Sequence, residues 1–105
     1  MAQFAVYHNN NPKSQSEIPY LVDVQSDLLS DLDSRVVIPL YTKKSLSTKP
    51  MTRLTPELQL EGKKFILMTP QMAGISVKEL GEPVCEITKN RNEIISSIDL
   101  LITGF

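Results

Sequence analysis

Hydrophobic positions in residues 90–105 recur every three to four residues, which predicts an amphipathic α-helix at the end of the chain. Asn90 and Glu93 have the spacing of a capping box at its start. Gly104 stands where a helix usually ends. The expected apolar stripe consists of Ile94, Ile95, Ile98, Leu101, Ile102 and Phe105.

The opposite face of this predicted helix is polar, with Leu100 as an apolar interruption. The helix reaches the last residue of the chain, so we expect its tip to be presented and not buried under further chain. We interpret this combination as a docking surface. The polar positions are Asn92, Ser96, Asp99 and Thr103.

Runs rich in β-branched, aromatic and alternating hydrophobic residues predict β-strands in the rest of the chain. The polar residues 9–17 are expected to join the first two strands as a wide hairpin, and residues 81–83 to form a turn. Pro39 marks a sheet edge, a bulge or a bend. Gly62 suits the tight turn of a second hairpin. The predicted strands cover residues 3–8, 18–24 and 35–41, both arms of the hairpin in 57–69, and residues 75–80.

The expected fold class is therefore mainly β with one C-terminal α-helix. We expect a small, partly closed antiparallel barrel or sheet with the helix packed across it. A chain of 105 residues predicts a single domain over residues 1–105, and it contains no internal repeat or low-complexity tract.

Leu28 and Leu29 are neighbours in a stretch, residues 25–34, that is otherwise dominated by Asp and Ser. Such a stretch favours turns. Two adjacent leucines in a loop are either a plug into the core or an exposed contact patch, and the pattern leaves both readings open.

Charge and composition exclude several kinds of function. The net charge of −1 provides no electrostatic case for binding nucleic acid or a membrane. No signal peptide and no membrane span is expected, which indicates a cytoplasmic protein. Cys85, as the single cysteine, excludes an internal disulfide, and we expect it to be a small buried hydrophobe.

A search for catalytic chemistry finds little. The lone His8 and the lone cysteine cannot assemble a zinc site, so no metal and no cofactor is expected. The sequence contains no glycine-rich phosphate loop and no nucleophile elbow. Binding, and not catalysis, is therefore the expected function, with no catalytic residue.

Four stretches make the sequence specific: LVDVQSDLL at 21–29, RVVIPL at 35–40, MTPQMAGISV at 68–77 and RNEIISSIDLL at 91–101. Together they resemble the CcdB family of toxin–antitoxin toxins. The resemblance implies an SH3-like barrel of the CcdB/MazF type and a symmetric homodimer. It also implies a toxin that binds the A subunit of DNA gyrase and traps the cleaved-DNA complex without making or breaking a bond.

The same resemblance implies a CcdA-like antitoxin, whose disordered tail wraps the toxin dimer. The toxin then reaches operator DNA only through the antitoxin complex, which represses its own operon. Carried over residue by residue, it places the dimer interface at Met72, Ala73, Gly74, Ile75 and Phe105. It places gyrase binding at Leu28, Leu29, Asp99, Thr103, Gly104 and Phe105.

Two positions depart from the family pattern. Family members ending in Trp-Gly-Ile stack the tryptophan on a gyrase arginine, and Thr103 stands in that place here. Asp99 likewise replaces an asparagine. Two alternatives to a gyrase poison follow. One is a ribonuclease like the MazF toxins, which share the barrel, and the other is a toxin that has lost gyrase binding and binds only its antitoxin.

Overall fold

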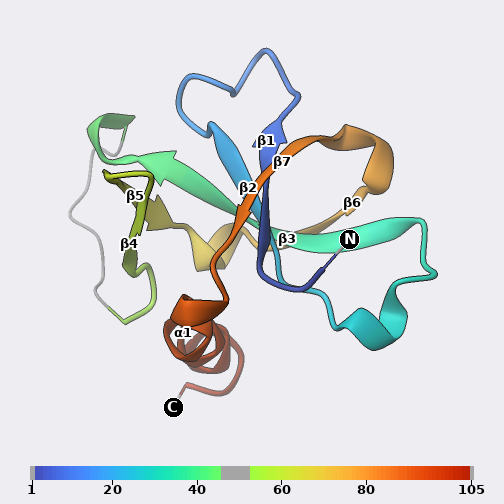
Figure 1. The fold of residues 1–105 in the computed structure, drawn as a ribbon. Helices are drawn as coiled ribbons and strands as arrows, with labels where there is room; N and C mark the ends of the chain where they lie inside the picture. The colour runs from blue at the N-terminus through green and yellow to red at the C-terminus, as the bar shows by residue number, and fades with distance from the viewer. Residues whose placement is uncertain (1, 46–52, 105) are drawn as a thin grey trace.

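A strongly curled antiparallel sheet forms the body of the protein, and the helix α1 lies across one end of it (Figure 1). The structure is a computed structural model that describes residues 2–45 and 53–104. The sheet has seven strands in the order β4-β5-β3-β2-β1-β7, with β6 paired to β3 beside this path. The predicted class, mainly β with one C-terminal helix, is confirmed as a half-barrel.

The strands are β1 (Ala5–Asn9), β2 (Tyr20–Asp23), β3 (Ser34–Thr42), β4 (Glu57–Leu60), β5 (Lys63–Leu67), β6 (Ala73–Ser76) and β7 (Leu80–Glu86). The helix α1 covers Arg91–Thr103. Short 3-10 turns join these elements: η1 (Asp27–Leu29), η2 (Lys43–Ser45), η3 (Thr69–Gln71), η4 (Val77–Glu79) and η5 (Thr88–Asn90).

Both predicted hairpins are present. Strands β1 and β2 pair across the loop of residues 9–17, and β4 pairs with β5. In the second hairpin the turn residues Glu61 and Gly62 both have positive φ, 52° and 81°. Two such residues are what a type I′ turn requires, and its twist matches that of the flanking strands.

Strand β3 is the central strand of the sheet, so Pro39 does not lie on an edge strand. One side of β3 pairs with β2, while its other side pairs first with β6 and then with β5. Pro39 falls at the change of partner, and its carbonyl accepts a hydrogen bond from the Met68 N–H at 2.9 Å. Pro39 therefore lies between the β6 ladder and the β5 ladder, where the lack of an N–H donor costs no ladder hydrogen bond.

The predictions for residues 75–80 and 81–83 are wrong. Strand β6 ends at Ser76, whose side chain accepts from the Lys78 N–H at 3.3 Å and caps the turn η4. Residues 81–83 then lie within β7 and not in a turn. Gly81 is needed there because a Cβ atom at this position would lie 2.7 Å from the His8 carbonyl oxygen. The glycine allows close strand approach, not a reversal.

The core has two parts on the two faces of the sheet. Strand β1 lies between β2 and β7, and side chains on both of its faces are buried, since Ala5 and Tyr7 are covered as well as Val6. The smaller cluster contains Ala5, Tyr7, Val37 and Leu80. The larger cluster contains Phe4, Val6, Val22, Val24, Ile38, Leu40, Leu58, Leu60, Phe65, Leu67, Ile87 and Ile94.

A fully buried ion pair, not predicted from the sequence, joins β2 to β3. Arg35 Nε donates to Asp23 Oδ2 at 2.7 Å, and both side chains have no exposed surface. Within the described residues, the buried Nη1 and Nη2 atoms of Arg35 have no hydrogen-bond acceptor. Burial raises the pKa of the neighbouring Tyr7, and the Asp23 charge raises it further.

Removing one member of this pair should destabilise the fold strongly. Asp23→Leu or Arg35→Met is expected to lower the free energy of unfolding by about 3–5 kcal/mol, because each leaves a buried charge without its partner. The double variant should lose much less than the sum of the two single losses. Urea unfolding curves measure all three values, and additive losses would contradict a coupled pair.

Candidate functional site

Among the described residues, the exposed large hydrophobic side chains lie in two places. The first is the segment between β2 and β3, residues 25–33, which we call the leucine loop. The second is the last turn of α1 with the residue after it, residues 99–104, which we call the helix tip. The exposed fractions are 95% for Leu28, 50% for Leu29, 51% for Leu32, 38% for Leu101 and 68% for Ile102.

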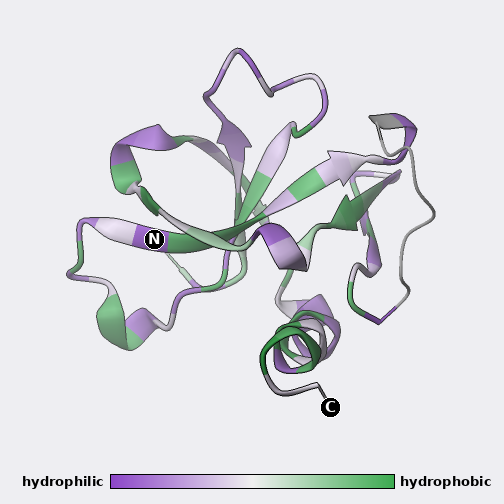
Figure 2. Cartoon of the chain, turned by 180° about the vertical axis from the view of Figure 1, so that it is seen from behind, coloured by the Kyte–Doolittle hydropathy of each residue, from purple (hydrophilic) through white to green (hydrophobic). Residues whose placement is uncertain are grey.

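The leucine loop presents its side chains from a structured turn. Ser26 Oγ accepts from the Leu28 N–H at 3.2 Å, and the Ser26 carbonyl accepts from the Leu29 N–H at 3.0 Å. This capped η1 turn directs the leucines away from the sheet. Figure 2 shows their hydrophobic colour on the turn at the edge of the molecule. Of the two sequence-based readings, the core plug is wrong, and the leucines are exposed as a contact patch would require.

Leu32 is a third exposed leucine that sequence reasoning did not single out. Its N–H donates to the Leu29 carbonyl at 3.2 Å, so it lies in the turn that follows η1. The available signal was its position three residues after Leu29 in the same Asp- and Ser-rich stretch.

The first half of α1 packs on the barrel, whereas its second half extends beyond it. Ile94 and Ser97 are buried, and Ser97 Oγ lies 2.9 Å from Thr69 Oγ1 of η3. Ile95 and Ile98 pack against the larger core cluster. The predicted stripe is therefore buried only at its start, and its continuation into the helix tip is exposed.

The two helix ends differ in how well they follow the sequence. The Asn90 side chain makes no hydrogen bond to the helix backbone, and its Nδ2 donates instead to Glu93 Oε1 at 2.9 Å, so the capping box is wrong. Gly104 ends the helix as predicted. Its φ is 80°, and its N–H donates to the Leu100 carbonyl at 3.0 Å.

Asp99 and Thr103 lie one turn apart and are both exposed. Thr103 Oγ1 donates to the Asp99 carbonyl at 2.7 Å, so this hydroxyl is bonded to its own helix. No ion pair within residues 2–45 and 53–104 involves the Asp99 carboxylate. Phe105, named for both predicted surfaces, lies outside the described residues.

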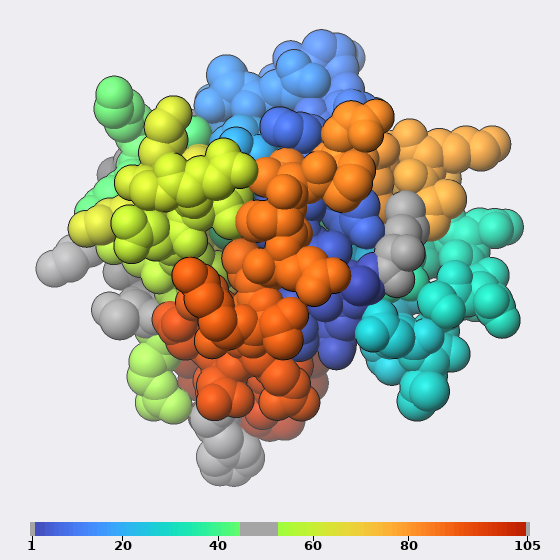
Figure 3. Space-filling view, in the orientation of Figure 1, coloured from blue at the N-terminus to red at the C-terminus, as the bar shows by residue number. Residues whose placement is uncertain are grey.

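A single chain does not bring the leucine loop and the helix tip together. The two lie on opposite sides of β1 in Figure 1. In the space-filling view the first residues of the chain, in dark blue, separate the loop from the helix (Figure 3). A partner that contacts both surfaces must span this distance or engage more than one protomer.

The predicted dimer segment, Met72 to Ile75, follows η3 and forms most of β6. Met72 packs against the larger core cluster and Ile75 against the smaller one, while Ala73 and Gly74 are exposed. In the described part of the chain, β6 pairs only with β3. Its outer edge is open, and the turn η3 that precedes it contacts α1.

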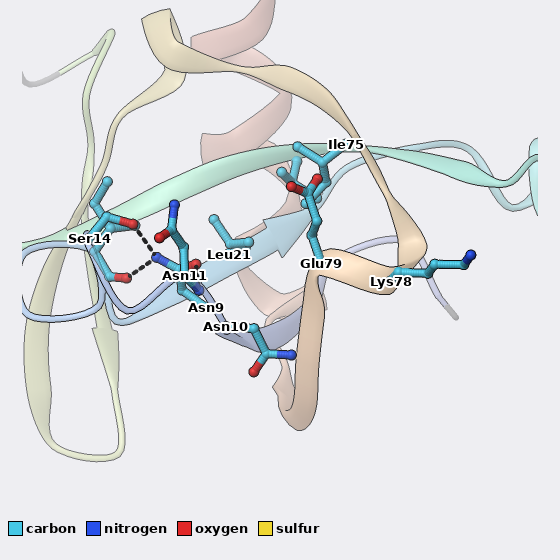
Figure 4. A pocket seen from close by; sticks show the side chains of 10 residues that line it. Asn9, Asn10, Asn11, Ser14, Leu21, Ile75, Lys78 and Glu79 are labelled. Atoms are coloured by element: carbon cyan, nitrogen blue, oxygen red, sulfur yellow. Dashed lines mark hydrogen bonds between the residues drawn. The ribbon is translucent and has the colours of Figure 1, made fainter.

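A pocket of about 450 Å³ lies between the 9–17 loop and η4 (Figure 4). The amide of Asn9 is already bonded within the loop, donating to Ser14 Oγ at 2.9 Å and to the Ile18 carbonyl at 2.8 Å. The ionisable groups of its lining are Lys78 and Glu79. The remaining lining residues are Asn10, Asn11, Leu21, Val37 and Ile75.

The histidine and the cysteine do not form a site together. His8 is exposed, with its ring 5.4 Å from that of Tyr20. Cys85 is half-buried, and burial raises the pKa of its thiol, which disfavours the reactive thiolate. Among the residues that the structure describes, no three His, Cys, Asp or Glu side chains cluster as metal ligands. None of the described helices has the length and apolar character needed to cross a membrane.

Comparison with solved structures finds the same architecture in an endoribonuclease in complex with its cognate antitoxin from Mycobacterial species. The TM-score is 0.74, over 97% of this chain and 94% of that chain, at 11% sequence identity. At so low a sequence identity, the structural similarity shows a shared fold and nothing more. Comparison with protein families matches residues 3–104 to the family described as CcdB protein. The exposed leucine pair, the helix and the half-barrel thus all lie within the matched region, and the chain belongs to the CcdB family.

Proposed function

We propose that this protein is the toxin of a toxin–antitoxin system that binds the A subunit of DNA gyrase and traps the cleaved-DNA complex. Membership of the CcdB family and the fold shared with a toxin–antitoxin protein support a toxin of this class. The observation that carries gyrase binding is the leucine loop, where Leu28 is almost fully exposed on a capped turn.

Exposed leucines contribute little to the fold but much to an interface. Burying one leucine side chain is worth about 1.5–3 kcal/mol. Leu28 gains most of this only when a partner covers it, whereas Leu29, already half covered, gains about half. The turn is already ordered by its own hydrogen bonds, so binding costs less conformational entropy than it would for a flexible loop. Apolar side chains held on a preorganised turn can therefore anchor a partner at a low entropic cost.

The helix tip supplies the polar part of the proposed interface. Its two exposed residues, Asp99 and Thr103, can meet one partner because they share a helix face. Gly104 lets the chain approach closely, since it has no side chain. Asp99 is proposed to pair with a gyrase arginine through charge-assisted hydrogen bonds, in place of the aromatic stacking used by family members with tryptophan.

The proposal includes three further partners. A second copy of the chain pairs through Met72–Ile75, a CcdA-like antitoxin covers the dimer, and operator DNA is reached through that complex. The protein acts in the cytoplasm, where gyrase is found, and performs no catalysis. Toxins neutralised by a disordered antitoxin tail gain stability when the tail binds, by mass action.

A ribonuclease is the second candidate, because the similar solved structure is an endoribonuclease. Such chemistry needs positioned acid and base groups and a basic groove for RNA. The pocket offers Lys78 and Glu79 as ionisable groups, which favours this candidate. The net charge of −1 argues against it, because it provides no general attraction for RNA. A toxin that binds only its antitoxin is the third candidate, motivated by Thr103.

Expression in two hosts separates the three candidates. Wild-type protein should stop growth of a host with sensitive gyrase and spare a host whose gyrase A subunit is resistant, and co-expressed antitoxin should restore growth. Arrest of both hosts indicates the ribonuclease, and arrest of neither indicates the antitoxin-binding protein.

Leu28→Ser should abolish the arrest while changing the free energy of unfolding by less than about 0.5 kcal/mol, since this leucine is exposed.

Thr103→Trp should tighten binding to the purified gyrase A subunit. Stacking on a cation contributes about 0.5–2 kcal/mol, which corresponds to roughly 2- to 30-fold in the dissociation constant. Asp99→Ala should weaken binding and reduce its dependence on salt concentration. Titration calorimetry at two salt concentrations measures both effects. Equal affinities for wild type and both variants would place the gyrase site elsewhere.

Gly74→Glu should convert a dimer to a monomer without unfolding it. An added Cβ at this position meets nothing within 4 Å in the single chain, so the monomer accommodates the side chain. In a symmetric interface, however, two glutamates would come together. Sedimentation should give twice 11.8 kDa for wild type and 11.8 kDa for the variant. The control Gln59→Glu, at an exposed position of β4, should remain dimeric. A wild-type monomer at micromolar concentration would refute the dimer.

A further inference from the structure

Gln25 stands out at the base of the leucine loop, because its side chain is buried while the leucines that follow it are exposed. Its amide bonds to two separate pieces of backbone. Oε1 accepts from the Val36 N–H of β3 at 3.1 Å, and Nε2 donates to the Leu29 carbonyl at 2.9 Å. One side chain therefore ties the exposed turn directly to the central strand.

The Gln25 side-chain amide makes the next hydrogen bond to β3 beyond the end of the backbone ladder. The last backbone bond between the two segments runs from the Val24 N–H to the Val36 carbonyl at 2.9 Å. The Val36 N–H then bonds to the Gln25 side chain and not to another backbone carbonyl. The chain can leave the sheet at this point without leaving a buried donor unpaired.

Two further contacts hold the same base. Asp23 Oδ1 accepts from the Gln25 N–H at 3.0 Å, while its other oxygen is paired with Arg35. On the outer side, the Gln3 N–H donates to Asp27 Oδ1 at 2.8 Å. Gln3 precedes Phe4, which has a φ of 70°, a rare conformation for a buried aromatic residue. At the base of the loop, Asp23 and Gln25 are thus buried and hydrogen-bonded, whereas Asp27 is exposed and bonds to the Gln3 N–H.

We propose that Gln25 is a positioning residue that fixes the Leu28–Leu29 turn in the conformation that the protein partner recognises. The inference rests on the proposed gyrase binding for the identity of that partner. Gln25 is too buried to contact the partner itself. Gln25 acts through Leu29, because its Nε2 donates a hydrogen bond to the Leu29 carbonyl. The same carbonyl accepts from the Leu32 N–H, so the following turn is held as well.

The chain offers a matched control for this role. Gln15 donates through Nε2 to the Asn9 carbonyl at 3.0 Å, so it makes the same type of bond within the 9–17 loop. Gln25→Met and Gln15→Met both replace a glutamine by an apolar side chain of similar length. Only the first removes a support of the leucine loop.

Hydrogen exchange and limited proteolysis test the positioning without any partner. In Gln25→Met the amides of Leu29 and Leu32 should exchange faster, and thermolysin should cut before Leu28 or Leu29 faster than in wild type. The Val22 amide of β2 should keep its protection, which shows that the fold is intact. Gln15→Met should leave the leucine loop unchanged. Unchanged exchange and cleavage in Gln25→Met would overturn the proposal.

A double-mutant cycle with the purified gyrase A subunit tests the effect on recognition. Gln25→Met should weaken binding roughly five- to tenfold, the scale of one lost hydrogen bond. In a Leu28→Ser, Leu29→Ser background it should have little further effect, because no leucines remain to be positioned. An equal loss in both backgrounds would show general destabilisation and overturn the positioning role. If wild type binds no gyrase, the proposed function fails, and exchange and proteolysis alone decide whether Gln25 holds the turn.

Discussion

The buried ion pair between Asp23 and Arg35 closes the base of the leucine loop. Asp23 is the last residue of β2, and Arg35 is the second residue of β3, so the pair joins the strands where the loop leaves and returns. Buried pairs are rarely optimal for stability, and two guanidinium nitrogens here lack an acceptor among the described residues. The structural effect of the Asp23–Arg35 pair is geometric, since the pair aligns the two strand ends between which the loop runs.

The two exposed apolar surfaces arise in different ways from one half-barrel. The leucine loop is exposed because polar residues at its base occupy the positions nearest the sheet, which leaves Leu28 and Leu29 on the outside. The helix tip is exposed because α1 is longer than the surface it packs on, so Ile102 has no core to cover it. Similar barrels support binding and catalysis, because function is decided by such local surfaces.

Much of the fold could be predicted from local patterns, and two of the differences have a common cause. The helix, the two hairpins and the Gly104 stop depend on neighbours in sequence, and they were predicted correctly. The turn predicted at Gly81 is wrong, because this glycine lets β7 approach β1. The alternatives for Pro39 were an edge, a bulge or a bend, and the edge is excluded because β3 is central and changes partner there. Both positions are decided by strands far away in the chain.

The sequence by itself determined the period of its hydrophobic residues, its turn chemistry and its family, because these depend on residue order and on motifs such as VDVQSD. It could not determine whether Leu28 points inward or outward, since both orientations satisfy the same local pattern. Tertiary structure decided this through Gln25 and Asp23, which bond to β3 and take the buried positions of the loop. Side-chain exposure is a property of the assembled sheet and helix, and for that reason the exposed leucine surface emerges only once distant strands are in register.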